Sequence, residues 1–336
     1  MEKSRKGITI AGSLIADVFY KIDTYPKEGL LTNIRETERY VGGSGNLITD
    51  LAKLNPDMPV KVSAVVGEDV NGDMLCRRLS EYPNIDLGNV TREGESSVPL
   101  VMNAQDTKQR TFFFLPASSD RYEKAYIDWS AVDAEIFHLE YLLLMAKVDA
   151  KDEIYGTHGA RILHEAQKRG MKTSIDIVSE QSTRAKEIVT CALKYTDFCS
   201  INEVEAQAIT GVVLTGEHEA GLDIRVMEAL KCLKDLGVST WAVIHSPGCG
   251  YGYDCTNNKF VKVSSLKLPE GYIKGTNGAG DAYCSGILYG AYEGMSLEEA
   301  MRFATACAAC SLSEENGTDG LRLSEDVWEL EKIYNR

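Results

Sequence analysis

The amino-acid sequence predicts an α/β fold in which helices cover both faces of a central, mostly parallel sheet. Short β-branched runs alternate with segments whose apolar residues recur at helical spacing along most of the 336 residues. The strand-like runs are apolar throughout rather than at every second position, as in parallel strands that are buried on both faces. Regular alternation of the two kinds of segment is typical of a sheet built from strand–helix–strand units.

The first part of the chain contains one such unit. Residues 8–11 and 60–66 are short, apolar and rich in β-branched side chains, so we expect two buried strands there. Between them, Leu47, Ile48 and Leu51 recur at the spacing of one helix face, which predicts a helix that contains 47–54.

The same alternation continues through the middle and the end of the chain. The further strands are expected at 136–139, 173–178, 198–201 and 241–245. The further helices are expected at 159–169, 184–193, 203–209, 226–236, 282–292 and 297–312. Because no long linker or repeat interrupts this order, one domain over residues 1–336 is the expected organisation.

Two segments break the alternation, at about 18–41 and 96–117. They carry strand-like pieces without helices between them, including the apolar run at 111–115. We expect them to form a small antiparallel sheet attached to the main body. Its function would be that of a lid over a cleft; a dimer surface or a plain edge hairpin are the alternatives.

Composition excludes several classes of partner. The formal net charge is −14, from 50 acidic and 36 basic residues, which argues against nucleic acid or an anionic membrane as a partner. No apolar run approaches the roughly 20 residues that span a bilayer. Nine cysteines lack the spacing of a disulfide framework, which favours free thiols and a cytoplasmic location. The five histidines show no metal-ligand spacing, so we interpret them as structural or surface residues.

The most informative segment is 275–281, with the sequence Gly-Thr-Asn-Gly-Ala-Gly-Asp, directly before an apolar helix. A helix N-terminus presents free N–H groups and the positive end of the helix dipole, so it can hold an anion. Gly278 and Gly280 would let the backbone approach a phosphate closely. Asp281 would repel such an anion, but it could take a proton from an attacking hydroxyl. Together these features indicate phosphoryl transfer.

Other interpretations of this segment are weaker. Glycines before a helix can form a plain turn, and Asp281 could simply complement the helix dipole. The chain has no Gly-Lys dipeptide, which excludes the phosphate loop G-x-x-x-x-G-K-[ST]. The segment also lacks the third glycine of the dinucleotide fingerprint and comes too late in the chain for that fold.

Two further clusters hold candidate ligand-binding residues. Gly42 and Gly43 precede the helix that contains 47–54, and Asn46 there could both donate and accept hydrogen bonds. Asp17 could accept hydrogen bonds from a pair of hydroxyl groups. Asn202-Glu203-Val204-Glu205 follows a strand, at the edge where parallel sheets bind ligands. Helix capping or turn formation is the structural alternative for each cluster.

Taken together, these motifs resemble the ribokinase-like (PfkB-type) carbohydrate kinase family over nearly the whole chain. The segment 278–281 resembles the G-A-G-D signature of that family, and 42–46 its glycine-pair signature. Asn202-x-x-Glu205 resembles the N-x-x-E motif, 66–72 resembles V-G-x-D-x-x-G, and Arg110-Thr111-Phe112 a strand of the lid. The resemblance implies the ribokinase-like fold and an ATP-dependent sugar kinase.

The resemblance also implies the role of each residue. Asp281 would be the catalytic base, and the N–H groups of Gly278, Ala279 and Gly280 would form an anion hole for the transferred γ-phosphoryl group. The acceptor would be held by Asp17, Gly42, Gly43, Asn46 and Arg110. The nucleotide would contact Asn202, Ser246, Gly248, Gly250 and Thr276. Glu205, together with Asn202, would organise Mg²⁺.

The sequence departs from the family pattern at three places. Gly275 stands where the family usually has an Asp that, in some members, helps to bind a monovalent cation, so potassium dependence is in doubt. Two residues rather than three separate the glycine pair from Asn46. The nucleotide loop at 245–250 is an unusual variant.

Three functions are therefore compared. The first is a kinase for a monosaccharide or sugar derivative, such as fructose, ribose or ketodeoxygluconate, and a phosphosugar is disfavoured because no basic cluster accompanies Asp17. The second is a nucleoside kinase on the same fold. The third is a catalytically silent sugar-binding protein. The sugar, the hydroxyl that is phosphorylated and the oligomeric state, including a homodimer through the lid, stay open.

Overall fold

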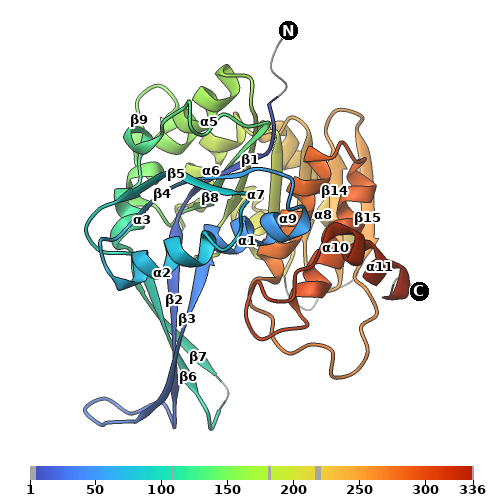
Figure 1. Cartoon of the computed structure of the whole chain (residues 1–336). Helices are drawn as coiled ribbons and strands as arrows, with labels where there is room; N and C mark the ends of the chain where they lie inside the picture. Colours follow the sequence, from blue (N-terminus) through green and yellow to red (C-terminus); the bar gives the residue numbers. More distant parts are fainter. Residues whose placement is uncertain (1–4, 108, 181–182, 216–220, 335–336) are drawn as a thin grey trace.

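A nine-stranded sheet forms the centre of the molecule, and most of its neighbouring strands run parallel (Figure 1). The computed structural model describes residues 5–334 apart from 108, 181–182 and 216–220. The strand order is β15-β14-β13-β12-β11-β8-β1-β4-β5. The strands are β1 (Ile8–Gly12), β4 (Val60–Val66), β5 (Ile85–Arg92), β8 (Ile136–Leu142), β11 (Lys172–Ile177), β12 (Phe198–Asn202), β13 (Trp241–His245), β14 (Cys249–Asp254) and β15 (Lys259–Ser264).

Helices cover both faces of this sheet because successive strand residues point to opposite sides and both sides are apolar. One face packs against α1 (Ser44–Leu54), α2 (Val70–Leu79), α9 (Ala279–Tyr292), α10 (Leu297–Ser311) and α11 (Ser324–Tyr334). The other face packs against α5 (His158–Lys168), α6 (Ala185–Leu193), α7 (Glu203–Thr210) and α8 (Leu222–Leu236). The predicted α/β fold with a mostly parallel sheet is therefore confirmed.

Several short elements come directly before and after β8 in the chain. They are α3 (Ala117–Arg121), the 3₁₀ turn η1 (Lys124–Tyr126), α4 (Ala146–Asp149) and the two-residue strands β9 (Lys151–Asp152) and β10 (Gly156–Thr157).

A second, four-stranded sheet projects from the main body, at the bottom of Figure 1. Its order is β3-β2-β6-β7, with the strands β3 (Ile34–Gly43), β2 (Leu14–Ile22), β6 (Val98–Ala104) and β7 (Arg110–Leu115). The strands come from the two segments in which the helix–strand alternation is lost. The sheet is mixed rather than purely antiparallel, because β2 and β6 run parallel. That part of the prediction was wrong, because β2 and β6 come from different segments and no tight turn joins them.

Every predicted strand and helix of the main body is present, with ends that differ by up to four residues. The sequence analysis missed α2, α11, β5 and the hairpin of β14 and β15, which adds two antiparallel strands at one edge of the sheet. Because β14 contains glycines, its sequence does not show the pattern of a strand. A Cβ at Gly250 would lie 2.3 Å from the Tyr283 hydroxyl oxygen, and one at Gly252 would lie 2.4 Å from Met301 Sδ. Only glycine lets α9 and α10 pack this closely on the strand.

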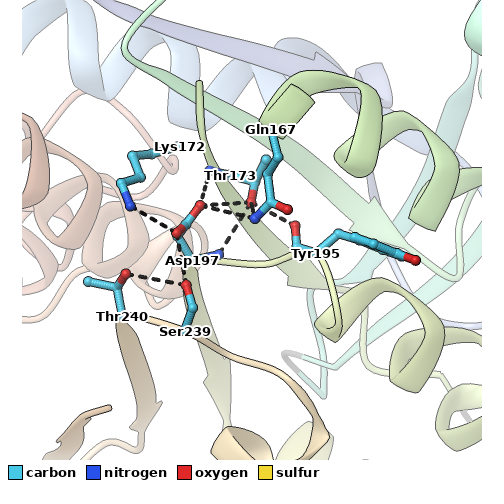
Figure 2. A network of polar contacts seen from close by, with 7 residues as sticks. All are labelled: Gln167, Lys172, Thr173, Tyr195, Asp197, Ser239 and Thr240. Carbon is cyan, nitrogen blue, oxygen red and sulfur yellow. Dashed lines mark hydrogen bonds and ion pairs between the residues drawn. The ribbon is translucent and has the colours of Figure 1, made fainter. Parts of the chain in front are cut away.

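A buried carboxylate joins three parallel strands at their amino ends (Figure 2). Asp197, just before β12, accepts hydrogen bonds from the backbone N–H and hydroxyl of Thr173, from Ser239 Oγ and from Lys172 Nζ. These bonds hold the pKa of Asp197 below its ordinary value, although burial alone would raise it. The network stabilises the amino ends of these strands, whereas the candidate site described below lies at the carboxyl ends.

Within the described residues, no helix combines the length and apolar character needed to cross a membrane. All nine cysteines lie in the described part of the chain, and none of them forms a disulfide.

Candidate active site

The N-terminus of α9 presents backbone N–H donors that no side chain caps. Gly278, the residue before the helix, has a φ of 73°, and no side chain caps the first turn. A Cβ at Gly278 would lie 2.5 Å from the Cα of Gly317, so a glycine is required both by the backbone and by the neighbouring loop. The N–H groups at the start of the helix are therefore free to bind an anion.

Asp281 lies in the first turn of this helix and is buried. Its two carboxylate oxygens accept hydrogen bonds from Asn46 Nδ2 and from the Tyr141 hydroxyl, both at 2.8 Å. Burial raises the pKa of Asp281, while these two hydrogen bonds act in the opposite direction. The two donors fix the orientation of the Asp281 carboxylate.

Tyr141 reaches Asp281 because the end of β8 is distorted. The pairing of β8 with β11 changes register between Ile175 and Ile177, and Tyr141 itself has a φ of 56°, in the left-handed region. Its backbone N–H donates to Asp176 Oδ1 at 3.0 Å. A bulge of this kind redirects a side chain relative to regular alternation, and such strain gathers at functional sites.

A cavity of about 830 Å³ opens in front of Asp281. It brings together most of the residues predicted to hold an acceptor or to transfer the phosphoryl group, namely Asp17, Gly43, Asn46, Gly278, Gly280 and Asp281. Asn202 and Glu205, predicted to contact the nucleotide and Mg²⁺, line it as well. We call it the acceptor cavity. All charged side chains that line it are carboxylates. Asp176 and Glu180 line it together with the carboxylates already named, and no lysine or arginine of the described chain does. Glu180 is paired with Arg184.

Asp17 faces the acceptor cavity from β2. Burial and the nearby Asp281 carboxylate raise the pKa of Asp17 to about 7. Gly42, on the neighbouring strand β3, supports this side chain from behind, since a Cβ there would lie 2.4 Å from the Asp17 carboxylate. Gly42 therefore acts on the cavity through Asp17 and does not line it.

A second cavity of about 740 Å³ lies on the other side of the α9 N-terminus. Its lining includes the predicted nucleotide residues Asn202, Ser246, Gly250 and Thr276. Its far wall is apolar and is built by Leu266, Leu268, Ile273, Ala308, Ala309 and Leu312. We call it the nucleotide cavity, because an apolar slot that ends at a helix N-terminus suits a base with attached phosphates.

The two cavities meet at Asn202, His245 and Gly280, which line both of them. Burial lowers the pKa of His245 to about 4, so its imidazole is neutral near pH 7. A group that enters from the nucleotide cavity thus meets Asp281 at the border with the acceptor cavity.

Asn202 and Glu205 form a reciprocal cap at the start of α7. Asn202 Oδ1 accepts from the Glu205 N–H, and Glu205 Oε2 accepts from the Asn202 N–H, both at 2.9 Å. The other oxygen, Oε1, accepts from Ser179 Oγ at 2.7 Å. Burial raises the pKa of Glu205 to about 7. Asn202 and Glu205 therefore form a helix cap, which was the structural alternative for this motif, and Asn202 lies where the two cavities meet.

Besides Gly42, two predicted residues lie outside the large cavities. Gly248 lines neither of them, and its carbonyl accepts from the N–H of Ser265 at 3.1 Å. Arg110 is exposed on β7 and lines a separate hollow of about 50 Å³, which it shares with Asp17 and Asn277.

Sequence reasoning missed three residues of the site: Tyr141, Asp176 and His245. All three lie in or directly beside the carboxyl ends of strands β8, β11 and β13, where ligands of parallel sheets bind. A polar residue at the end of an otherwise apolar strand is the signal that could have found Asp176 and His245.

Comparison with known proteins agrees with this geometry. Residues 6–322 match the family described as pfkB family carbohydrate kinase. The chain is 22% identical to a ribokinase of Arabidopsis thaliana, over 97% of this chain and 81% of that protein. It is 23% identical to a deoxyribokinase of Salmonella typhi, over 91% of this chain and 92% of that protein.

Solved structures with the same fold include several with bound ligands. The Arabidopsis thaliana ribokinase complexed with ribose and ATP superimposes with a TM-score of 0.78 at 22% identity, covering 98% of this chain and 99% of that chain. A structure from E. coli in complex with ATP and Mg²⁺ gives 0.73 at 16% identity, covering 98% and 100%. A nucleoside kinase of Methanocaldococcus jannaschii gives 0.75 at 19%, covering 99% and 100%. At these identities the likeness establishes the fold. The family match over residues 6–322 goes further: this chain belongs to the pfkB family of carbohydrate kinases.

Proposed function

We propose that this carbohydrate kinase transfers the γ-phosphoryl group of ATP to a hydroxyl group of an uncharged monosaccharide. The observation that carries the proposal is the meeting of the two cavities at Gly280, beside Asp281 and at the N-terminus of α9. One cavity suits a nucleotide and the other a small polar acceptor. The only buried carboxylate of the α9 first turn lies where they join.

In the proposed reaction Asp281 accepts the proton of the acceptor hydroxyl. The hydroxyl oxygen then bonds to the γ-phosphorus, and the bond to the β–γ bridging oxygen breaks, which releases ADP. The N–H groups of Gly278, Ala279 and Gly280 stabilise the negative charge on the transferred group. Asn46 and Tyr141 hold Asp281 in the geometry required for the proton transfer.

The acceptor would lie between β2 and the start of α9. Asp17 accepts hydrogen bonds from its hydroxyl groups, and Gly43 lets the acceptor approach the backbone. An acceptor with its own carboxylate or phosphate would be repelled by the carboxylates of the cavity. The cavity therefore favours neutral sugars such as ribose or fructose over sugar acids such as ketodeoxygluconate.

The donor set at the border of the cavities fits a magnesium ion that accompanies ATP. Asn202 and Glu205 supply amide and carboxylate oxygens, the ligand type that Mg²⁺ takes, and both are already engaged in the α7 cap. They would therefore hold the ion through its water molecules. When bound, the ion would neutralise charge on the ATP phosphates.

Three further features belong to the proposal. The second sheet acts as a lid, since Phe112 and Phe114 of β7 reach the acceptor cavity and would exclude water from it. A monovalent cation is not included, because a Cβ at Gly275 would lie 2.8 Å from the Glu315 carbonyl oxygen and the loop leaves no room for an Asp. The free thiols favour a cytoplasmic location.

A screen of ADP release tests the substrate class. The protein with Mg-ATP is tested against neutral pentoses and hexoses, sugar acids, phosphosugars and nucleosides, with and without K⁺. We expect turnover with a neutral monosaccharide that is independent of K⁺. Turnover with only a nucleoside would contradict the acceptor class and support the second function, while ATP and sugar binding without turnover would support a silent binding protein.

A further inference from the structure

At the floor of the acceptor cavity, His138 and three other potential metal ligands, from three elements in all, lie close together. His138 and Glu140 lie on β8, Asp176 on β11 and Cys284 on α9. All four are buried. None of them transfers a proton or a phosphoryl group in the proposed reaction, although Asp176 and Cys284 line the acceptor cavity.

Strand alternation explains why they meet. His138 and Glu140 are two residues apart, so they share one face of β8, which is the face covered by α9. Ser174 pairs with His138 in the neighbouring strand, and Asp176 follows two residues later. Cys284 lies on the α9 turn after Asp281. Because the ligands come from separate elements, their spacing along the sequence gives no sign of a metal site.

The distances between the ligand atoms suit one small ion. His138 Nε2 lies 3.4 Å from Glu140 Oε2 and 3.9 Å from Asp176 Oδ1. Ligand atoms of His138, Asp176 and Cys284 all lie within 4.8 Å of one another. In a tetrahedral site with metal–ligand bonds of about 2.0–2.3 Å, ligand atoms are roughly 3.3–3.7 Å apart. Glu140 and Cys284 belong to different groups of mutually close ligand atoms, so a four-ligand site requires these two side chains to move toward each other.

Several potential ligand atoms of His138 and Glu140 form no hydrogen bond. His138 Nε2 and both carboxylate oxygens of Glu140 are buried without a hydrogen-bond partner. His138 Nδ1, in contrast, is bonded to Ser174 Oγ at 3.0 Å. A histidine whose one nitrogen is fixed by a neighbour while the other is free is the usual arrangement of a metal ligand. Buried polar atoms without partners are rare and call for a missing ligand.

The charges point the same way. Within the described part of the chain, the only ion-pair contacts of Glu140 and Asp176 are with His138. Burying ionised carboxylates without a cation is costly. A divalent cation would remove that cost.

We propose that His138, Glu140, Asp176 and Cys284 bind one zinc ion. A thiolate and an imidazole among the ligands favour Zn²⁺ over Mg²⁺, which takes oxygen ligands. The ion can enter from the acceptor cavity, whose lining includes Asp176 and Cys284. It would lie beside Asp281, which shares a group of mutually close carboxylate oxygens with Glu140 and Asp176. The site stands independently of the proposed kinase reaction.

Metal content and cobalt substitution test the site on the purified full-length protein. Zinc is measured by elemental analysis before and after dialysis against a chelator, and the stripped protein is then titrated with Co²⁺. We expect about one zinc per chain and, with cobalt, a tetrahedral visible spectrum with a thiolate-to-cobalt charge-transfer band. Added zinc should also raise the Tm of the stripped protein.

Two serine variants locate the ligand. Cys284→Ser should abolish the charge-transfer band, whereas Cys307→Ser, at a buried cysteine of α10 outside the cluster, should retain it. If Cys284→Ser fails to fold, Glu140→Gln, which keeps the side-chain volume, should weaken Co²⁺ binding at least tenfold, by the loss of one ligand. No uptake of either metal by the wild-type protein would overturn the proposal. So would a cobalt spectrum without a thiolate band, a band that survives in Cys284→Ser, or unchanged affinity in Glu140→Gln.

Discussion

Asp281 receives its two hydrogen bonds from side chains that are far apart in the sequence, Asn46 and Tyr141. The glycine signatures of the sequence predict Asn46 and Asp281, since both stand beside turns that only glycine can form. They do not predict the contact between these two side chains. Tyr141 lies at the end of an apolar strand without any motif, and only the bulge in β8, with its left-handed φ, brings the hydroxyl to Asp281.

The hydrogen bond from Tyr141 can be tested by removing one atom. Tyr141→Phe should lower kcat about tenfold, because a hydrogen bond to a charged group contributes about 1.5 kcal/mol. KM for ATP should stay within about twofold, since Tyr141 lines only the acceptor cavity. Steady-state kinetics measures both.

Tyr122→Phe is the matched control for that variant. The Tyr122 hydroxyl is also buried and hydrogen-bonded, to Ser63 Oγ at 2.8 Å, but Tyr122 lines neither of the two large cavities. Its loss should reduce stability and leave kcat unchanged. Equal effects of the two variants on kcat would show that Tyr141 acts through the fold rather than on Asp281.

Gly42 offers a second test, of the acceptor side. A Cβ at this position would meet the Asp17 carboxylate at 2.4 Å, so Gly42→Ala should displace Asp17. Loss of one hydrogen bond to the acceptor should raise the acceptor KM roughly tenfold. In Gly248→Ala, where a Cβ meets nothing within 4 Å, the acceptor KM should not change. An unchanged acceptor KM in Gly42→Ala would mean that Asp17 does not hold the acceptor.

At the scale of the elements, the parallel strands were predictable because each is a short apolar run with a helix on either side. The β14–β15 hairpin was not, since Gly250 and Gly252 are placed there by contacts with α9 and α10. Those contacts are long-range, and glycines in a strand do not reveal them. The register shift at the end of β8 is hidden for the same reason.

The polar network around Asp197 connects β11, β12 and β13 and gives an element-scale prediction (Figure 2). Asp197→Asn should lower the free energy of unfolding by about 2 kcal/mol at pH 7, because charged hydrogen bonds become neutral ones. The folded-state pKa of Asp197 lies below the ordinary 3.8, so its contribution is complete above that value and is lost as the pH falls through the folded pKa.

Urea unfolding at several pH values checks this sign. The difference between wild type and Asp197→Asn should be constant from about pH 7 to pH 5 and should shrink below about pH 4. Asp235→Asn, at an exposed aspartate of α8, should show no comparable loss. A difference that grows toward low pH would contradict the assigned role of Asp197.

At the scale of the whole molecule, the second sheet ends in an apolar strand that is unpaired on its outer side within the described residues. β7 is the edge of this sheet, and Phe112, Phe113, Phe114 and Leu115 are all exposed on it. Phe112 and Phe114 line the acceptor cavity, so by strand alternation Phe113 and Leu115 lie on the opposite face. An exposed edge strand with apolar side chains is a surface that favours pairing with a second copy.

A homodimer through this edge should be visible in solution. We expect the wild-type protein to sediment with about twice the mass of the chain, and Phe113→Lys to shift it toward the monomer, because a charge on the apolar edge opposes pairing. Sedimentation equilibrium measures the mass. Wild-type protein that is monomeric at micromolar concentration, or a Phe113→Lys variant that stays dimeric, would contradict this mode of assembly.

The order of motifs along the chain was enough to predict which residues gather around the α9 N-terminus. It was not enough to predict that the charged lining of the acceptor cavity consists of carboxylates, because Asp176 and Glu180 belong to no motif. Nor did the order of motifs show that Arg110, on β7, lies outside that cavity. Those features depend on how the two sheets are placed against each other.

The central claim is that Asp281 is the base at the junction of the two cavities, and the turnover of Asp281→Asn tests it most directly. This nearly isosteric variant should lower kcat by 10³-fold or more on the neutral sugar identified by the screen. Its Tm and its affinity for ATP should stay close to those of the wild type, because the α9 N-terminus is intact. A variant that folds, binds ATP and turns over the sugar at a near-normal rate would contradict the account.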